Sequence, residues 1–165
     1  DRPAIGLLNI GTEETKGNEL VKESYHLLKE KSEELGINFI GNVEGRDAFS
    51  GKVDAIVTDG FTGNVFLKTA EGLGKFVKRT LSESLTQNIF AKIGAIPCLP
   101  AINRFKKTMD YKSYGGALFL GVKKPVVKAH GSSDEKLFEF TIKQAEKFVE
   151  NKAVDKMIEY FEKNV

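Results

Sequence analysis

VDAIVTDGFTGNVFLKTAEGLGKFVKRTLSESL, residues 53–85, contains two structural patterns in direct succession. Its first part, VDAIVTDG, is a short apolar run that ends in Asp59 and Gly60 and is typical of a buried strand. The remainder predicts a long helix that begins near Gly63. A buried strand followed directly by a helix is the unit from which α/β folds are built.

The same alternation of strand and helix continues on both sides of this stretch. Further strands are predicted at residues 3–11, 37–44, 115–122 and 125–131. Helices are predicted from Asn18 to a terminating Gly36, at residues 132–152 and in the last segment of the chain. The pattern therefore predicts an α/β fold with a mostly parallel sheet in the middle.

Composition narrows the class of protein. The 165 residues are 41% hydrophobic and 29% charged, which suits one folded globular domain. The formal net charge of +2 is too small to argue for nucleic acid. Because Cys98 is the one cysteine, we expect no internal disulfide and no cysteine-rich metal site, and a reducing compartment is the simplest interpretation. No apolar run approaches the about 18 residues of a membrane span.

One segment interrupts the alternation of strands and helices. It covers residues 84–109 and contains several basic residues but no acidic one. Its apolar middle is split by Pro97 and Pro100, which predicts a protruding helical hairpin at about residues 84–112, called the arm below. Two compatible interpretations stay open. The arm could pack on the core or on a dimer partner, or its tip could contact a membrane surface with basic residues facing anionic lipid.

Four predicted strands end in polar loops that contain glycine. These loops are Asn9–Glu19, Gly41–Asp47, Thr58–Asn64 and Lys128–Asp134. In open α/β sheets, ligands bind beyond the carboxyl ends of the strands. The four loops therefore predict a cleft for a ligand.

Two of the loops lead directly into helices, whose free N–H groups and partial positive charge suit a phosphate. In the last loop the candidate phosphate-binding residues are Lys128, His130, Gly131, Ser132 and Ser133. In the third loop, Gly63 and Asn64 open the helix and Lys68 lies one turn further. The simpler alternative is that Ser132 or Ser133 caps one helix and Asp59 caps the other.

Other chemistries have weak support. Neither loop has the spacing of a nucleotide-binding P-loop or of a dinucleotide fingerprint. Cys98 is far in sequence from both histidines, so a cysteine nucleophile with a histidine base is improbable, and His26 suits a surface or interface position. Glu13, Glu14 and Lys16 form either a solvated loop or part of a site.

Several segments together resemble one enzyme family. These are LLNIGTEETKGNELVKESYHLL, NFIGNVEGRD, VDAIVTDGFTGNVFLKTAEGL, MDYKSYGGALFLGV and VVKAHGSSD. In this order they resemble the phosphate acyltransferase of bacterial phospholipid synthesis, which transfers an acyl group from acyl carrier protein to phosphate. The family's chain is about twice as long, and the likeness is to its C-terminal half. Since the chain also begins without a methionine, we expect it to be a processed or truncated product.

The resemblance implies a three-layer α/β/α fold of the isocitrate-dehydrogenase-like and phosphotransacetylase-like type. It implies a homodimer in the cytoplasm that associates peripherally with the cytoplasmic membrane and binds no nucleic acid. The reaction would convert a long-chain acyl thioester on acyl carrier protein and inorganic phosphate into acyl phosphate and free carrier. Neither a metal nor a cofactor is implied.

The resemblance also suggests roles for residues. His130, Ser132 and Ser133 would hold phosphate, with added charge from Lys128, and the related acetyltransferases have an arginine where His130 stands here. Asn64 would stabilise the oxyanion, within a wall that includes Asp59, Gly60, Gly63 and Lys68. Thr12, Glu13, Lys16 and Asn18 would order the first loop near the thioester, and Arg46 would meet a phosphate or an acidic carrier. The arm would lie beside the membrane end of a channel for the acyl chain. Its apolar residues there would be Ile93, Ile96, Leu99 and Ile102.

Three alternatives remain. The protein could be a phosphate acetyl- or butyryltransferase that uses coenzyme A thioesters, or a noncatalytic half that only dimerises and docks on a membrane. An oxidoreductase of the same fold would need a nicotinamide fingerprint, and none is visible in the sequence.

Overall fold

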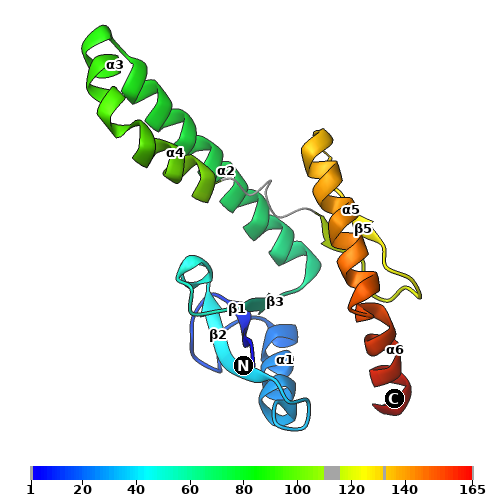
Figure 1. Ribbon diagram of the computed structural model, residues 1–165. Coiled ribbons are helices and arrows are strands. Elements are labelled where there is room, and N and C mark those ends of the chain that lie inside the picture. The colour runs from blue at the N-terminus through cyan, green and yellow to red at the C-terminus, as the bar shows by residue number, and fades with distance from the viewer. Residues whose placement is uncertain (1, 110–115, 132, 165) are drawn as a thin grey trace. The chain divides into compact units, whose positions relative to one another are not determined.

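The structure, a computed structural model, describes residues 2–109, 116–131 and 133–164 (Figure 1). The chain divides into two compact units, Asp1–Val77 and Lys78–Val165. One long helix, α2 (Gly60–Thr86), begins in the first unit and ends in the second.

A three-stranded parallel sheet is the centre of the first unit (Figure 1). β1 (Ala4–Asn9) is its middle strand, with β2 (Asn38–Glu44) on one side and β3 (Ala55–Val57) on the other. Leu7 and Leu8 are only 3% and 7% exposed although consecutive side chains of a strand point to opposite faces. Both faces of β1 are therefore covered, as is usual in a parallel sheet.

The helix α1 (Glu19–Lys31) links β1 to β2. It begins as predicted, because the Asn18 side chain caps it and accepts a hydrogen bond from the Val21 N–H at 3.0 Å. It is shorter than predicted: the helix ends at Lys31, and Gly36 lies in the turn that follows, with φ of 65°. Tyr25 packs its ring edge-on against Phe39 of β2, with 5.5 Å between ring centroids.

The strand-to-helix stretch forms β3 and α2, with the short helix η1 (Asp47–Phe49) before it. α2 begins at Gly60, earlier than the predicted start near Gly63. The reason is Asp59, whose Oδ1 accepts hydrogen bonds from the N–H groups of Phe61 and Thr62, both at 2.9 Å.

The prolines divide the arm as predicted. α3 (Ile89–Ala95) is followed by a short helix, η2 (Ile96–Cys98), and by α4 (Leu99–Thr108), which forms a hairpin with the end of α2 (Figure 1). Pro97 and Pro100 lie in the first turns of η2 and α4, where their missing N–H groups would have no partner within the helix. Residues 110–112, which were assigned to the end of the arm, lie outside the described residues.

The last part of the chain forms a small antiparallel pair and two helices. β4 (Ala117–Leu118) pairs with β5 (Val127–Lys128), and α5 (Glu135–Glu150) and α6 (Ala153–Asn164) follow. These two strands are shorter than predicted and are not parallel, because the connection at residues 119–126 is shorter than the about 12 residues of a parallel crossover. Leu137 and Val154 are the buried apolar residues of α5 and α6.

The parallel sheet with its connecting helices confirms the predicted α/β class and is consistent with a three-layer α/β/α arrangement. Across the described ranges, no helix is both long and apolar enough to cross a membrane.

Candidate active site

Three of the four predicted loops meet at one edge of the parallel sheet. They follow β1, β2 and β3, and parallel strands have their carboxyl ends at the same edge. The fourth loop, Lys128–Asp134, belongs to the second unit. The first unit therefore brings three of the predicted loops and the start of α2 to one edge of its sheet.

The loop after β1 is bound to the sheet through two asparagines. Asn9 of β1 donates from Nδ2 to the carbonyl oxygen of Lys16 at 3.0 Å, and Asn42 of β2 donates from Nδ2 to the carbonyl oxygen of Glu13 at 2.9 Å. Glu13 and Lys16 also pass close to Gly11, where a Cβ atom would lie 2.7 Å from Glu13 Oε2 and 3.0 Å from Lys16 Cγ. A side chain at Gly11 would therefore displace the Glu13 and Lys16 side chains from their present positions.

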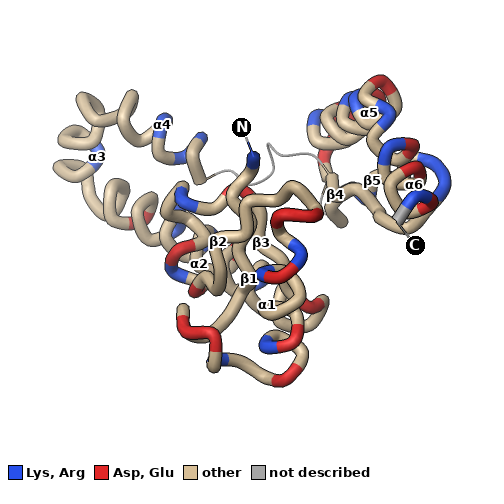
Figure 2. The backbone as a smooth tube through the Cα atoms, turned by 90° about the horizontal axis from the view of Figure 1, so that it is seen from below, with Lys and Arg blue, Asp and Glu red and all other residues tan. Residues whose placement is uncertain are grey.

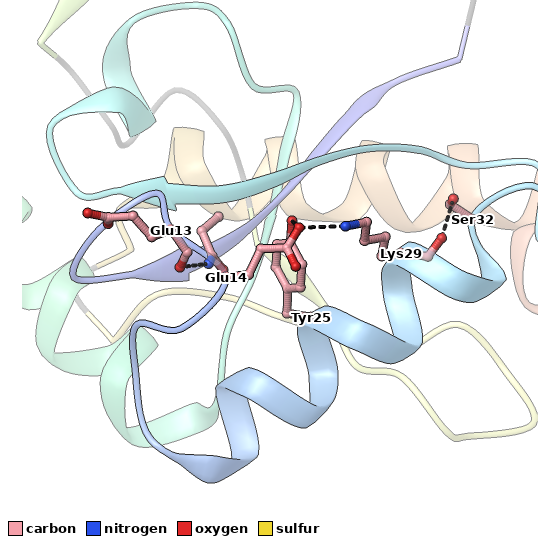
Figure 3. A network of polar contacts seen from close by, with 6 residues as sticks. Glu13, Glu14, Tyr25, Lys29 and Ser32 are labelled. Carbon is pink, nitrogen blue, oxygen red and sulfur yellow. Dashed lines mark hydrogen bonds and ion pairs between the residues drawn. The ribbon is translucent and has the colours of Figure 1, made fainter.

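A third contact holds the loop from α1. Figure 3 shows Tyr25 and Lys29 converging on the Glu14 carboxylate, with the Tyr25 hydroxyl at 3.0 Å and Lys29 Nζ at 2.5 Å. Lys29, and then Tyr25, lower the pKa of Glu14 by hydrogen bonding to its charged form. Burial, and then Glu14, raise the pKa of Tyr25, so near neutral pH the phenol keeps its proton and donates it to the carboxylate.

At the start of α2, Asp59 acts as the helix cap, which was the simpler of the two interpretations. The side chain of Thr62, and then backbone N–H groups, lower the pKa of Asp59 by hydrogen bonding to its carboxylate. Gly63 allows the helix to approach Thr58, since a Cβ atom there would lie 2.6 Å from Thr58 Cγ2. A Cβ atom at Gly60 would meet nothing within 4 Å.

Asn64 and Lys68 lie on one side of the first turns of α2. With Phe61, Val65 and Thr69 they line an open hollow of about 480 Å³. Lys68 forms an ion pair with Glu71 at 3.0 Å, so part of its charge is balanced within the helix. Asn64 thus presents an exposed amide in an open hollow close to the helix start.

A small apolar cavity lies beside the same edge of the sheet. It has a volume of about 220 Å³ and is bounded by β1, α1 and β3. Its apolar residues include Leu7, Leu8 and Val57, while Thr58 and Asp59 add polar groups next to the start of α2. Apolar and polar groups therefore adjoin at this point.

The remaining predicted residues of the first unit have surface positions. Arg46 is exposed and forms an ion pair with Glu44. Thr12 is exposed in the first loop, and Asn18 serves as the cap of α1.

In the second unit the helix start differs from the prediction. The cap of α5 is Asp134, whose Oδ1 accepts from the Leu137 N–H at 3.0 Å. The hydroxyl of Ser133 donates to the carbonyl oxygen of His130 at 2.6 Å and forms a local turn with it. Ser133 is therefore not the cap, while Ser132 lies outside the described residues. Lys128 and Gly131 are exposed.

The arm encloses a separate apolar cavity of about 190 Å³ between the end of α2 and α4. Three of the four predicted membrane-contact residues, Ile96, Leu99 and Ile102, line this cavity, whereas Ile93 does not. Cys98 is exposed. Within the residues that the structure describes, no group of three or more His, Cys, Asp and Glu side chains could hold a metal ion.

Sequence comparison decides the family. A family model described as "Fatty acid synthesis protein" matches residues 1–156. The chain belongs to this family. The match agrees with the resemblance seen in the motifs and covers both structural units.

Several curated relatives of this chain are named "Phosphate acyltransferase". The relative from Thermoanaerobacter pseudethanolicus is 48% identical over 98% of this chain and 48% of its own length. Those from Clostridium novyi and Clostridium acetobutylicum are 47% and 50% identical over 99% and 94% of this chain, and 48% and 46% of their own lengths. The chain thus spans about half the length of the curated relatives it matches.

Three polar residues that hold the first loop received no individual role in the sequence analysis. Asn9, Asn42 and Tyr25 each bond to the first loop from a regular element. The available signal was a polar side chain inside an otherwise apolar strand, as at Asn42 in INFIGNVE. Its bonding partner, 29 residues away in sequence, could not be identified without the fold.

Proposed function

We propose that the protein transfers a long-chain fatty acyl group from acyl carrier protein to inorganic phosphate, giving acyl phosphate for phospholipid synthesis. The observation that carries the proposal is 47–50% identity, over 94–99% of the chain, to relatives named phosphate acyltransferase. The edge of the parallel sheet supports it, because three ordered loops and an apolar cavity meet there.

In the proposed reaction, a phosphate oxygen attacks the thioester carbonyl carbon and forms the new C–O bond. The tetrahedral intermediate then collapses, the C–S bond breaks, and the carrier leaves as a thiolate that takes a proton from solvent. No acyl-enzyme is formed. Holding the two reactants in line accounts for most of the acceleration.

Asn64 is the proposed donor to the oxyanion of this intermediate. Its position in an open hollow of the first turns of α2 supports the role, since the amide is accessible there. Gly60 keeps the backbone at the helix start open to a substrate, since nothing lies within 4 Å of its Cβ position, and Gly63 is a proposed part of the same wall. Thr12, Glu13 and Lys16 are the proposed thioester contacts of the first loop, with Asn18, Asp59 and Lys68 supporting the site from the helices.

Phosphate binding is proposed for Lys128, His130, Gly131, Ser132 and Ser133. Because Asp134 already occupies the Leu137 N–H of α5, the phosphate would depend on side chains more than on the helix start. Lys128 supplies positive charge, and His130 supplies either charge or a hydrogen-bond donor.

The proposed partners are acyl carrier protein, anionic membrane lipid and a second copy of the protein. Arg46, exposed beside Glu44, would contact the pantetheine phosphate or an acidic surface of the carrier. From Ser84 to Met109 the arm has basic but no acidic residues, and Figure 2 shows these basic residues in blue on α3 and α4. This positive charge suits peripheral contact with anionic lipid of the cytoplasmic membrane. The protein is proposed to act as a homodimer in the cytoplasm.

The test is phosphate-dependent formation of acyl phosphate by the full-length polypeptide that carries this sequence. We expect palmitoyl-carrier to be used far better than butyryl-coenzyme A. A preference for the butyryl substrate would instead indicate a short-chain phosphate acyltransferase. Absence of both activities would leave a noncatalytic role.

A further inference from the structure

The loop at residues 11–17 is held at successive points by side chains from three different elements. Asn9 of β1 binds the carbonyl of Lys16, Asn42 of β2 binds the carbonyl of Glu13, and Tyr25 of α1 binds the carboxylate of Glu14. Contacts from separate elements restrict a loop more than contacts within the loop do, because each element is rigid. The loop is therefore preorganised by the sheet and by α1.

Of the three residues that hold the loop, Asn42 is the most buried, with 6% of its surface exposed. Its Nδ2 binds Glu13, but its buried Oδ1 has no hydrogen-bond partner within the described residues. Burying an unpaired acceptor lowers stability, and an apolar side chain of the same shape would avoid that loss. The bond to Glu13 favours folding while the unpaired acceptor opposes it, so stability gives only a weak reason for an asparagine at this position.

The contact of Asn42 has a direct effect on the groups proposed to meet the substrate. The Glu13 carbonyl also accepts the Lys16 N–H at 3.1 Å, so one oxygen joins the strand to both ends of the turn. The same turn places the Glu13 and Lys16 side chains over Gly11. A shift of the Glu13 carbonyl would therefore move both side chains together.

We propose that Asn42 is a positioning residue for acyl transfer, which holds the loop at residues 11–17 in the geometry that the thioester requires. Tyr25 assists from α1 through Glu14. The inference rests on the proposed function, because the loop is expected to bind the thioester. Asn42 itself touches no substrate, and it acts through the Glu13 carbonyl.

The test replaces Asn42 by leucine, which has a similar shape but cannot donate. The matched control is Asn38→Leu, on the same strand at an exposed position. Asn42→Leu should unfold at the same or a higher denaturant concentration than the wild type. Its kcat/KM for the acyl thioester should fall about 10- to 100-fold, as expected for misplaced reacting groups. The Asn38→Leu control should keep the wild-type value.

Two further measurements separate the possible results. Hydrogen exchange at the Lys16 amide should become faster in Asn42→Leu, and Tyr25→Phe should lower kcat/KM by a smaller factor. If Asn42→Leu fails to fold, or loses stability in step with activity, the role is structural and the proposal is wrong. If wild-type and Asn42→Leu activities agree, the proposal is also wrong, although the proposed function stands. If the wild type transfers no acyl group, the proposed function fails. The loop-holding role is then tested by hydrogen exchange alone, and an equal exchange rate at the Lys16 amide in Asn42→Leu and in the wild type would reject it.

Discussion

At the scale of single residues, two aspartates change how the helix starts should be understood. Asp59 and Asp134 cap α2 and α5, the two helices whose first turns were predicted to bind phosphate. A capping carboxylate uses N–H groups and introduces negative charge where a phosphate would otherwise bind. Phosphate binding in the last loop would thus depend on side chains such as His130 and Lys128.

His130→Ala provides the test of that dependence. We expect the KM for phosphate to rise about 10- to 100-fold, the range for loss of a hydrogen bond to a charged group. The KM for the acyl thioester should change little, because the two substrates are proposed to meet different loops. Steady-state kinetics with each substrate varied in turn measures both values.

His26→Ala is the matched control for this substitution. His26 is exposed on α1 and lies outside the proposed phosphate site, so its loss should leave the KM for phosphate unchanged. An unaltered phosphate KM in His130→Ala would rule out the proposed phosphate contact.

At the scale of elements, the arm has two apolar surfaces. Ile96, Leu99 and Ile102 line the cavity between α2 and α4, so part of their surface serves packing within the arm. Ile93 lies outside that lining and is 58% exposed. Ile96 is 60% exposed although it lines the cavity, so the proposed membrane contact would involve both Ile93 and Ile96.

Ile93→Glu should weaken binding to liposomes that contain anionic lipid by roughly 10-fold or more, because it removes an apolar contact and adds a repelled charge. Co-sedimentation with vesicles measures the change. Thr108→Glu, which adds the same charge at the exposed C-terminal end of α4, away from α3, should have a smaller effect. Equal binding by Ile93→Glu and the wild type would contradict membrane contact through α3.

At the scale of the whole molecule, a large amount of apolar surface is open to solvent. In the second unit, a hollow of about 1180 Å³ is lined mainly by apolar residues, among them Phe119, Leu120, Met157 and Phe161. Extended apolar surface of this kind is uncommon on monomeric proteins and favours association. Such a surface suits a covering partner, which could be a second copy, as in the proposed homodimer, or the part of the relatives' length that this chain does not span.

Sedimentation equilibrium of the full-length polypeptide should give twice the monomer mass at micromolar concentration. Moderate salt should not dissociate the dimer, because apolar contacts are not screened by ions. A monomer at every concentration tested would contradict the proposal.

Much of the architecture was predictable because it depends on neighbouring residues. The apolar run around Ile56 predicts a strand, Asn18 predicts a helix start, and the pair Pro97 and Pro100 predicts the hairpin of the arm. The start of α2 was predicted too late because Asp59 and Gly63 are both residues that commonly flank the start of a helix. Only the capping hydrogen bonds that Asp59 accepts distinguish them.

Pairing over long distances required the tertiary structure. Short apolar runs at residues 115–122 and 125–131 do not reveal whether their strands are parallel, and the short connection between them decides for the antiparallel pair. In the same way, Asn42 meets Glu13 only because β2 lies beside β1. Motifs along the chain thus identified the family, and they predicted which loops form the candidate site. The contacts that order the first loop arise where separate elements pack together.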